Sequence, residues 1–329
     1  MPTLAGGDRL EECVRSIAAQ TLSGIEIIVV DNSGKGIVSQ LPALLESGAK
    51  VIENRENAGF GAAINQGIRA SSTPFVATLN DDAAAHPHCF AELLAAIEQR
   101  YEIGMCAPQI RLAGEERLDS AGMLIARDGS SRQRGHGEPA ANYSRAQQAL
   151  LPSGCAAIYR RDMLEEIGLF DDHFFLYCED TDIGLRARWK LWECMYVPGA
   201  IVEHHYSQTA GKASALKAYY VERNRHFLVI RNFPLRELFM APWFAIARYA
   251  WHVIYLVGGR GKAAEYTREG LGAITLVGIT IRALLAMFAA FPRLWSERRA
   301  IQNNGRATPR QISKLLATYR ISERQVASL

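Results

Sequence analysis

The sequence predicts an α/β protein in which a buried sheet is flanked by helices. Short apolar runs at 25–30 and 75–79 have the length and composition of parallel strands that are covered on both faces. Amphipathic segments alternate with such runs, as at 10–20, where apolar residues recur at helical spacing. Acidic or amide side chains follow both strands, at the carboxyl ends where open α/β sheets bind their ligands.

The composition divides the chain into two parts. With 49% hydrophobic and 22% charged residues among 329, the chain is globular and not disordered. Residues 1–230 hold 22 Lys and Arg against 29 Asp and Glu, whereas residues 231–329 hold 15 against 5. We therefore expect a catalytic domain at 1–232 and a basic, apolar helical region at 233–329 that associates with a membrane.

Cysteine spacing and the first residues indicate the compartment. The six cysteines include no C-x-x-C pair and no metal-ligand spacing, so we expect them to be reduced core residues. The first eight residues contain no apolar run of the kind found in secretory signals. The catalytic part is therefore expected in the cytoplasm, and no nucleic-acid partner is expected.

The remaining elements follow the same alternation. The stretch 114–148 is rich in Gly, Arg, Asp and Ser without periodicity, which is typical of a functional or mobile loop. Elsewhere the pattern predicts helices at 41–45 and 90–100, and strands at 50–52, 103–108, 153–159 and 195–205.

Two acids follow the strand at 75–79. Asn80, Asp81 and Asp82 occupy its carboxyl end, where neighbouring carboxylates are costly unless they meet a cation. Carboxylate oxygens suit Mg²⁺ or Mn²⁺, which bind one or two protein carboxylates together with substrate phosphates. The alternative is an ordinary turn, because Asn-Asp is a favoured turn pair.

A glycine-containing loop at 57–67 enters a predicted helix. Its backbone amides could cradle a phosphate at the helix N-terminus. Glycines at a helix start also serve close packing, which is the more frequent use, so both interpretations remain open.

A second acidic cluster lies in the segment 170–188. Glu179, Asp180 and Asp182 stand at the expected N-terminus of a short helix and are preceded by aromatic residues. An acidic cap with Arg186 pairing back by one turn would explain them structurally. The apolar setting favours a functional role, because it would desolvate the acids.

Two histidines end the strand-like run at 195–205. A lone histidine is more often structural than a ligand. His204 and His205 follow a strand in a chain with two acidic clusters, so one of them is a candidate metal ligand.

As an ordered set, these motifs resemble the family 2 glycosyltransferases, particularly the rhamnosyltransferase-like branch that builds bacterial surface polysaccharides. The motifs are V-V-D-N-S, N-x-G-F-x-x-A-x-N-x-G, L-N-x-D, G-x-F-D-x-x-F-F-x-Y-x-E-D-x-D-x-x-x-R and P-x-A-x-V-x-H. The resemblance covers about residues 2–230. It implies the GT-A fold, a Rossmann-like mixed sheet that binds a nucleotide-sugar at its strand ends.

The resemblance also implies roles for individual residues. Asp180 would be the catalytic base, and Asp82 and His204 would bind the divalent metal, Mg²⁺ or Mn²⁺. His205 is the less suitable of the two histidines. The donor would be contacted by Asp31 at the base, by Asp81 near the ribose, and by Thr3, Asn32, Asn57 and Gly59.

The implied reaction is an inverting transfer of a sugar, with rhamnose as the candidate. The donor would be dTDP- or UDP-linked, and the acceptor would be a hydroxyl of a lipid-linked or polysaccharide glycan. The alternative is a catalytically silent relative that acts as a membrane-bound scaffold of a polysaccharide assembly complex.

The C-terminal region contains two long apolar runs, 238–257 and 271–291. Each is long enough to span a bilayer but carries an arginine near its middle, Arg248 or Arg282. We expect helices that lie in the membrane interface, with 293–310 against anionic lipid head groups. Spanning helices and a soluble helical core are the alternatives. The protein would then be peripheral at the cytoplasmic face of the inner membrane.

The chain starts within a motif. Related chains open with an apolar strand before the Pro-Thr segment, and here Pro2 and Thr3 follow the first methionine directly. We therefore expect a truncated first strand, which a 3-2-1-4 sheet would place between the strands at 25–30 and 75–79. The expectation is that the natural start lies about six to eight residues upstream.

Overall fold

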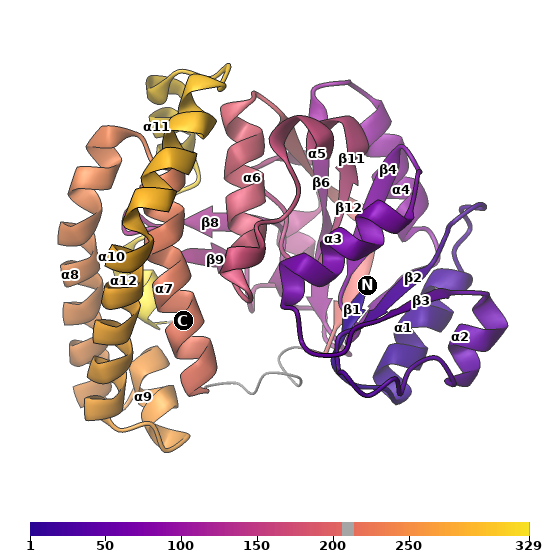
Figure 1. Ribbon diagram of the computed structural model, residues 1–329, viewed down its shortest axis with the longest axis horizontal. Coiled ribbons are helices and arrows are strands. Elements are labelled where there is room, and N and C mark those ends of the chain that lie inside the picture. Colours follow the sequence, from indigo (N-terminus) through magenta and orange to yellow (C-terminus); the bar gives the residue numbers. More distant parts are fainter. Residues whose placement is uncertain (206–213, 329) are drawn as a thin grey trace. The chain divides into compact units, whose positions relative to one another are not determined.

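The computed structural model describes residues 1–205 and 214–328, which form two compact units (Figure 1). The first unit contains Met1–Met123, Gln133–Phe175 and 192–205. The second contains Leu124–Arg132, Leu176–Leu191 and 214–328. The units are thus interleaved in sequence and are not divided at residue 232. The assignment of 1–232 as the catalytic domain concerns function and stays a prediction.

The first unit has a mixed α/β architecture, as expected. A small parallel sheet has the order β1-β2-β3. The larger sheet has the path β10-β12-β6-β11-β4, with β5 paired to β12 and β7 paired to β6. The strands are β1 (Pro2–Thr3), β2 (Ile28–Asp31), β3 (Lys50–Glu53), β4 (Phe75–Leu79), β5 (Ala83–Ala85), β6 (Ile103–Leu112), β7 (Leu118–Ser120), β10 (Gln147–Ala149), β11 (Ala156–Arg160) and β12 (Glu193–His204).

Strand directions bring the candidate residues to one edge of the larger sheet. β12 runs parallel to β6, and β11 is antiparallel to both β6 and β4. Consequently β4, β6 and β12 share one direction, and their carboxyl ends lie at the same edge. The expected 3-2-1-4 order is only partly present, because the two-residue β1 pairs with β2 and β4 pairs with β11 among the described residues.

Helices cover the strands of the first unit. The predicted amphipathic helix is confirmed as α1, which buries Leu10, Cys13, Val14 and Ile17. Helix α4 packs on β6 and β12, and its apolar face joins the core of the larger sheet. The helices of this unit are α1 (Asp8–Ala18), α2 (Pro42–Ser47), α3 (Phe60–Ala70), α4 (Cys89–Glu98) and α5 (Arg161–Ile167), with the 3₁₀ turns η1 (Ala140–Tyr143) and η2 (Asp172–Phe174).

The stretch 114–148 is a built part of the structure, and the mobile-loop interpretation is wrong. It contains β7, β10, η1 and the paired strands β8 (Met123–Ile125) and β9 (Ser131–Gln133). Asp119 and Asp128 within it are 1% and 0% exposed. These strands are only three residues long and belong to different sheets, so no local periodicity reveals them.

The second unit is helical. Helix α7 packs along α10, and α8 contacts α9 and α12. The elements are α6 (Glu179–Trp189), α7 (Ala215–Asn232), α8 (Leu235–Val257), α9 (Gly261–Arg268), α10 (Ala273–Asn303), α11 (Pro309–Thr318) and α12 (Glu323–Ser328). Among the described helices, α10 alone is long and apolar enough to cross a membrane, as judged from length and composition.

Basic residues of the C-terminal region are partly turned inward. Arg298, which was expected against lipid head groups, is 2% exposed and donates to the carbonyls of Ile230 and Phe233. Arg293 pairs with Glu297 at 2.7 Å. The expectation that all of 293–310 faces lipid is therefore wrong, because carbonyls at the C-terminal end of α7 need donors and Arg298 supplies them.

Arg248 on α8 is buried within an ionic network. Its guanidinium donates to Asp128 at 2.6 Å and to Glu222 at 2.8 Å, and Arg225 pairs with the same two carboxylates. Burial raises the pKa of Glu222, but the two arginines outweigh it and hold that pKa well below its ordinary value. The charge of Arg248, which lies within the apolar run 238–257, is therefore neutralised inside the second unit.

Replacing Arg248 by Met should destabilise the second unit by about 3–5 kcal/mol, because two buried carboxylates lose a counter-charge. Urea unfolding would measure this loss, with Arg236→Met at an exposed position of α8 as the matched control. In the folded chain the pKa values of Asp128 and Glu222 lie below their ordinary values. The stability that these ionised carboxylates contribute is therefore lost as the pH falls through their folded-state pKa values. The difference between Arg248→Met and the unchanged chain should therefore shrink in acid. Equal stability of the two chains at neutral pH would contradict the account.

Candidate active site

Asp82 and His204 are brought together by the register between β5 and β12. The antiparallel ladder pairs His204 with Ala83, and the amide of His205 donates to the carbonyl of Asp82 at 3.0 Å. As a result, Oδ1 of Asp82 lies 3.2 Å from Nε2 of His204. The predicted metal-ligand pair thus lies at one place, although 122 residues separate its members in sequence.

Asp119 orients this imidazole and was not predicted. Its Oδ2 lies 2.8 Å from Nδ1 of His204, and its Oδ1 lies 3.1 Å from Nδ1 of His136. Burial raises the pKa of Asp119, but its interactions with these two histidines lower it by more, and the net shift is downward. The carboxyl group is therefore ionised and accepts hydrogen bonds. Because a carboxylate only accepts, Nδ1 of His204 carries a proton. Nε2 is the nitrogen left to face Asp82.

The carboxylate of Asp82 and the imidazole of His204 are donor types that fit a divalent metal ion. Asp82 is 8% exposed, and no hydrogen bond from the described residues reaches its buried Oδ1. Burial lowers the pKa of His204, but Cys155, Asp119 and Asp82 raise it and the net shift is upward. A cation would replace that proton. Among the described residues, no group of three or more His, Cys, Asp or Glu is placed to hold a metal ion, so further ligands would come from phosphate and water.

A pocket of about 800 Å³ opens beside this pair. Residues 4–10 line it together with Asp81 and Asp82. The hydroxyl of Thr3 donates to Oδ2 of Asp81 at 2.6 Å, which holds this carboxylate at the pocket. Burial, followed by the charge of Asp82, raises the pKa of Asp81, while the Thr3 hydrogen bond lowers it and the net shift is upward.

Asp31 and Asn32 shape the loops that follow β2. Both oxygens of Asp31 accept backbone amides, from Ser33 at 2.9 Å and from Ile37 at 3.1 Å. Asn32 donates to Asn57 at 2.9 Å and accepts from the amide of Ala58 at 3.0 Å. Their contact with a nucleotide stays a prediction.

The amides of the glycine loop are used inside the protein. Those of Gly59 and Phe60 donate to the side chain of Asn57 and the carbonyl of Phe175, at 2.9 and 2.7 Å. Gly59 has a φ of 93°, and a Cβ there would lie 2.7 Å from that carbonyl. The structure thus favours close packing over the phosphate cradle, while donor contact of Asn57 and Gly59 stays a prediction.

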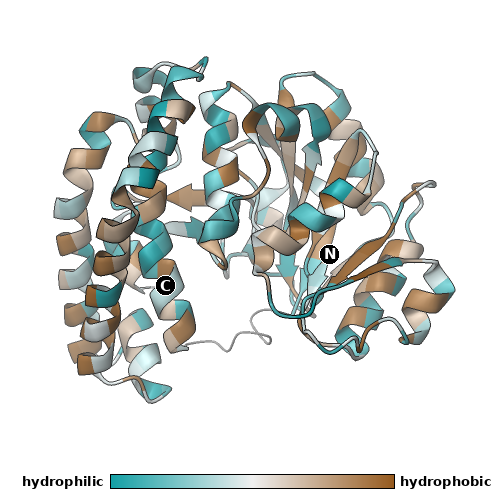
Figure 2. Cartoon of the chain, viewed as in Figure 1, coloured by the Kyte–Doolittle hydropathy of each residue, from teal (hydrophilic) through white to brown (hydrophobic). Residues whose placement is uncertain are grey.

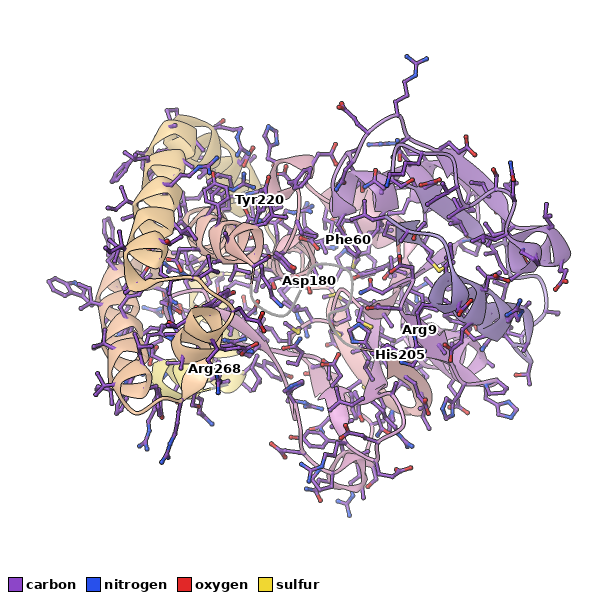
Figure 3. The ribbon with its side chains drawn as sticks, turned by 90° about the horizontal axis from the view of Figure 1, so that it is seen from below. Arg9, Phe60, Asp180, His205, Tyr220 and Arg268 are labelled. Carbon is purple, nitrogen blue, oxygen red and sulfur yellow. The ribbon has the colours of Figure 1, made fainter. Side chains whose placement is uncertain are left out.

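The second acidic cluster begins helix α6 in the second unit, where Figure 3 labels Asp180. Asp182 is fully buried and accepts from Arg186 at 2.8 Å, which is the structural alternative raised for this cluster. Burial and the charge of Asp180 raise the pKa of Glu179 to about 8. Asp180 is half-buried, and its Oδ1 accepts from the amide of Thr181 at 2.6 Å. Asp180 is thus the most accessible of the three carboxylates.

Asn224 supports the segment before α6 and was not predicted. Tyr177 and Cys178 both have a φ of 68°, a conformation that non-glycine residues rarely adopt and that stores strain near functional sites. The buried Nδ2 of Asn224 donates to the carbonyls of Leu176 and Tyr177 at 2.8 and 2.7 Å. Asn224 therefore fixes the turn that leads into Glu179 and Asp180.

Comparison with curated proteins gives related sequences. The chain is 26% identical over 243 residues to N-acetylglucosaminyl-diphospho-decaprenol L-rhamnosyltransferase of Mycobacterium tuberculosis, covering 66% of this chain and 79% of that protein. It is 25% identical over 187 residues to the amylovoran biosynthesis glycosyltransferase AmsE of Erwinia amylovora, covering 54% and 64%.

Solved structures share the fold. The structure of GalNAc-T7 with UDP, GalNAc and Mn²⁺ has a TM-score of 0.56 at 16% identity, covering 68% of this chain and 45% of that one. The mannosyltransferase PcManGT of Pyrobaculum calidifontis with GDP-Man and Mn²⁺ has a TM-score of 0.50 at 14% identity, covering 96% and 85%. The family model described as "Glycosyl transferase family 2" matches residues 1–168, about half of the chain. The chain therefore belongs to glycosyl transferase family 2, is similar to its rhamnosyltransferase branch, and has the GT-A fold of these enzymes.

Proposed function

We propose that the protein is an inverting, metal-dependent glycosyltransferase that moves a sugar from a nucleoside-diphosphate donor to an acceptor hydroxyl. One observation carries this proposal. Asp82 is a buried carboxylate whose Oδ1 has no hydrogen bond from the described residues and faces an imidazole nitrogen at 3.2 Å. The adjoining pocket of about 800 Å³ lies in the size range of small-molecule sites.

The names of similar proteins support the substrate classes. The two similar structures contain UDP or GDP-Man with Mn²⁺. The mycobacterial relative is named for rhamnosyl transfer to a diphospho-decaprenol lipid. For this chain we propose a dTDP- or UDP-linked donor, with rhamnose as the leading candidate sugar, and a lipid-linked or glycan acceptor.

In this proposal the first unit binds the donor. Asp82 and His204 would hold Mg²⁺ or Mn²⁺, and such an ion would supply positive charge to neutralise the departing diphosphate. A ligand set that includes imidazole suits Mn²⁺ better than Mg²⁺. Asp119 keeps Nε2 of His204 unprotonated toward the cation, and Asp81 lies near the ribose, where Thr3 holds it.

The nucleoside is assigned to the loops after β2. We propose that Asp31 and Asn32 contact the base. Hydrogen bonds from backbone amides hold both side chains in place. Asn57 and Gly59 support the loop that carries Asn32, because the side chain of Asn57 accepts from both Asn32 and the amide of Gly59.

Asp180 is proposed as the base. It takes the proton of the acceptor hydroxyl while that oxygen attacks the anomeric carbon from the face opposite the diphosphate. The bond between the anomeric carbon and the diphosphate oxygen breaks, and its electron pair stays on the diphosphate. A single displacement of this kind inverts the anomeric configuration. Glu179 and Asp182 are unsuited, because burial keeps Glu179 protonated at neutral pH and Arg186 occupies Asp182.

Membrane association rests on an exposed apolar surface of the second unit. Residues of α8 and α10 that are apolar and exposed include Trp243 at 71% and Ile274 at 89%, and Figure 2 shows hydrophobic stretches along the C-terminal helices. Arg260 and Arg268 are exposed between the two helices. We propose a peripheral protein that docks on anionic lipid at the cytoplasmic face of the inner membrane. A lipid-linked acceptor would be presented there.

Asp180→Asn should lower turnover by about 10²–10⁴-fold, because an amide cannot take the acceptor proton. Nucleoside diphosphate release with a panel of nucleotide sugars measures turnover, and calorimetry should show unchanged UDP or dTDP binding. Glu179→Gln is the matched control, which should retain most activity at pH 7 because Glu179 is already protonated there. A near-normal rate for Asp180→Asn would remove it as the base. A wild-type chain that binds donors without turnover would favour the scaffold alternative.

Replacing Ile281 and Leu285 together by Glu should release the full-length protein from anionic vesicles, because these exposed residues of α10 would otherwise enter the lipid interface. Sedimentation with phosphatidylglycerol vesicles measures binding. The control adds the same charge at exposed polar positions of α10, Ser296→Glu with Asn303→Glu, and should bind nearly as well. Carbonate washing should extract the wild-type protein from membranes. Resistance to that wash would instead indicate a spanning helix.

A further inference from the structure

Arg9 lies at the pocket and is held there by two neighbours. It belongs to the residues 4–10 that line the pocket beside Asp81 and Asp82. Its Nη1 lies 2.8 Å from Nε2 of His205 and 2.9 Å from Oε2 of Glu12 (Figure 3 labels Arg9 and His205). His205 in turn is hydrogen-bonded through its amide to Asp82. The guanidinium is thereby tethered next to the proposed metal pair.

The charges around the pocket call for an anionic ligand with a cation. Among the lining residues in the described chain, Asp8, Asp81 and Asp82 are acidic and Arg9 alone is basic. The buried Oδ1 of Asp82, which no hydrogen bond from the described residues reaches, indicates a cation at this wall. A diphosphate that carries a divalent cation satisfies both the carboxylate and the guanidinium.

The backbone at the same wall also favours an anion. Helix α1 begins after Gly7, and its first turn lines the pocket with Arg9. The first amides of a helix have no partner within the helix, and the helix dipole is positive at this end. Gly7 has a φ of 126° and no side chain to cap these amides, so they remain available to phosphate oxygens.

We propose that Arg9, with the first amides of α1, binds the diphosphate of the donor opposite the Asp82–His204 pair. This inference rests on the proposed function, and it names a residue for the leaving group. The guanidinium would donate two parallel hydrogen bonds to diphosphate oxygens. When the bond to the anomeric carbon breaks, the electron pair stays on a diphosphate oxygen, whose charge Arg9 stabilises without transferring a proton.

The simpler explanation is a solvated ion pair. The side chains of Arg9 and Glu12 are both 47% exposed and stand three residues apart on one helix, and such pairs contribute little to stability. The same helix offers a matched control in Arg15, which pairs with Glu11 and is 59% exposed. Arg15 is not among the residues that line the pocket.

The test compares the binding of UDP and UMP, and of dTDP and dTMP, to full-length variants in the presence of Mn²⁺. Calorimetry should show that Arg9→Ala weakens diphosphate binding by about 10- to 100-fold and monophosphate binding much less. Arg9→Lys should restore part of the affinity, because lysine keeps the charge but not the planar fork. Arg15→Ala should bind all four nucleotides like the wild type. Thermal unfolding midpoints should match for all variants.

Two binding results and one turnover result would overturn the inference, and all three are separable from failure of the proposed function. Arg9→Ala with wild-type affinity for diphosphates would show that Arg9 is only a surface ion pair. An equal loss for monophosphates and diphosphates would place Arg9 at the nucleoside or the α-phosphate, and not at the β-phosphate that carries the leaving oxygen. If the wild type binds diphosphates through Arg9 but releases none from any nucleotide sugar, the proposed function fails and the inference stands. Normal turnover by Arg9→Ala would instead leave the proposed function standing and overturn the inference.

Discussion

The candidate site depends on the backbone ladder between β5 and β12. Three alanines, Ala83–Ala85, pair antiparallel with the end of β12, where Ala83 lies opposite His204 and Asp82 comes to lie beside its imidazole. A shift of one residue would turn the imidazole to the other face of the sheet, since side chains alternate along a strand. Ala83 and Ala85, at 2% and 6% exposed, belong to the core of the larger sheet, so larger side chains there would have to displace their neighbours. Backbone pairing thus brings together Asp82 and His204, which we propose as the metal ligands.

Electrostatics then separates the acidic residues into different roles. Asp182 and Asp128 are compensated by buried arginines and stabilise the fold. Asp119 is compensated by two histidines and orients one of them. Asp82 alone among these buried acids has an oxygen that no hydrogen bond from the described residues reaches. Asp82 faces the imidazole of His204 at 3.2 Å and also lines the pocket, which is why we propose it as the position for a divalent cation.

Sequence reasoning located the elements that carry strong local patterns. Helix α1 and strand β4 lie where the periodicity predicted them, and the resemblance identified Asp82 and His204, which the structure brings together. Asp119 could not be found in this way, because it lies in a three-residue strand within a segment of no periodicity. Its partner is 85 residues away in sequence. Arg9 was not predicted because the sequence does not show that the start of α1 lines a pocket. Without the pocket, an arginine there cannot be distinguished from any solvated arginine.

The most direct test of this account is the affinity for Mn²⁺ in the presence of UDP, measured from the electron paramagnetic resonance signal of free Mn²⁺. Asp82→Ala should abolish tight binding, and Asp119→Asn should weaken it by about 10- to 100-fold, because Nδ1 of His204 loses its charged acceptor. Glu115→Gln, at an exposed position of the turn before β7, should bind Mn²⁺ like the wild type. Unchanged affinity in both Asp82→Ala and Asp119→Asn would contradict the assignment of this pair as the metal site.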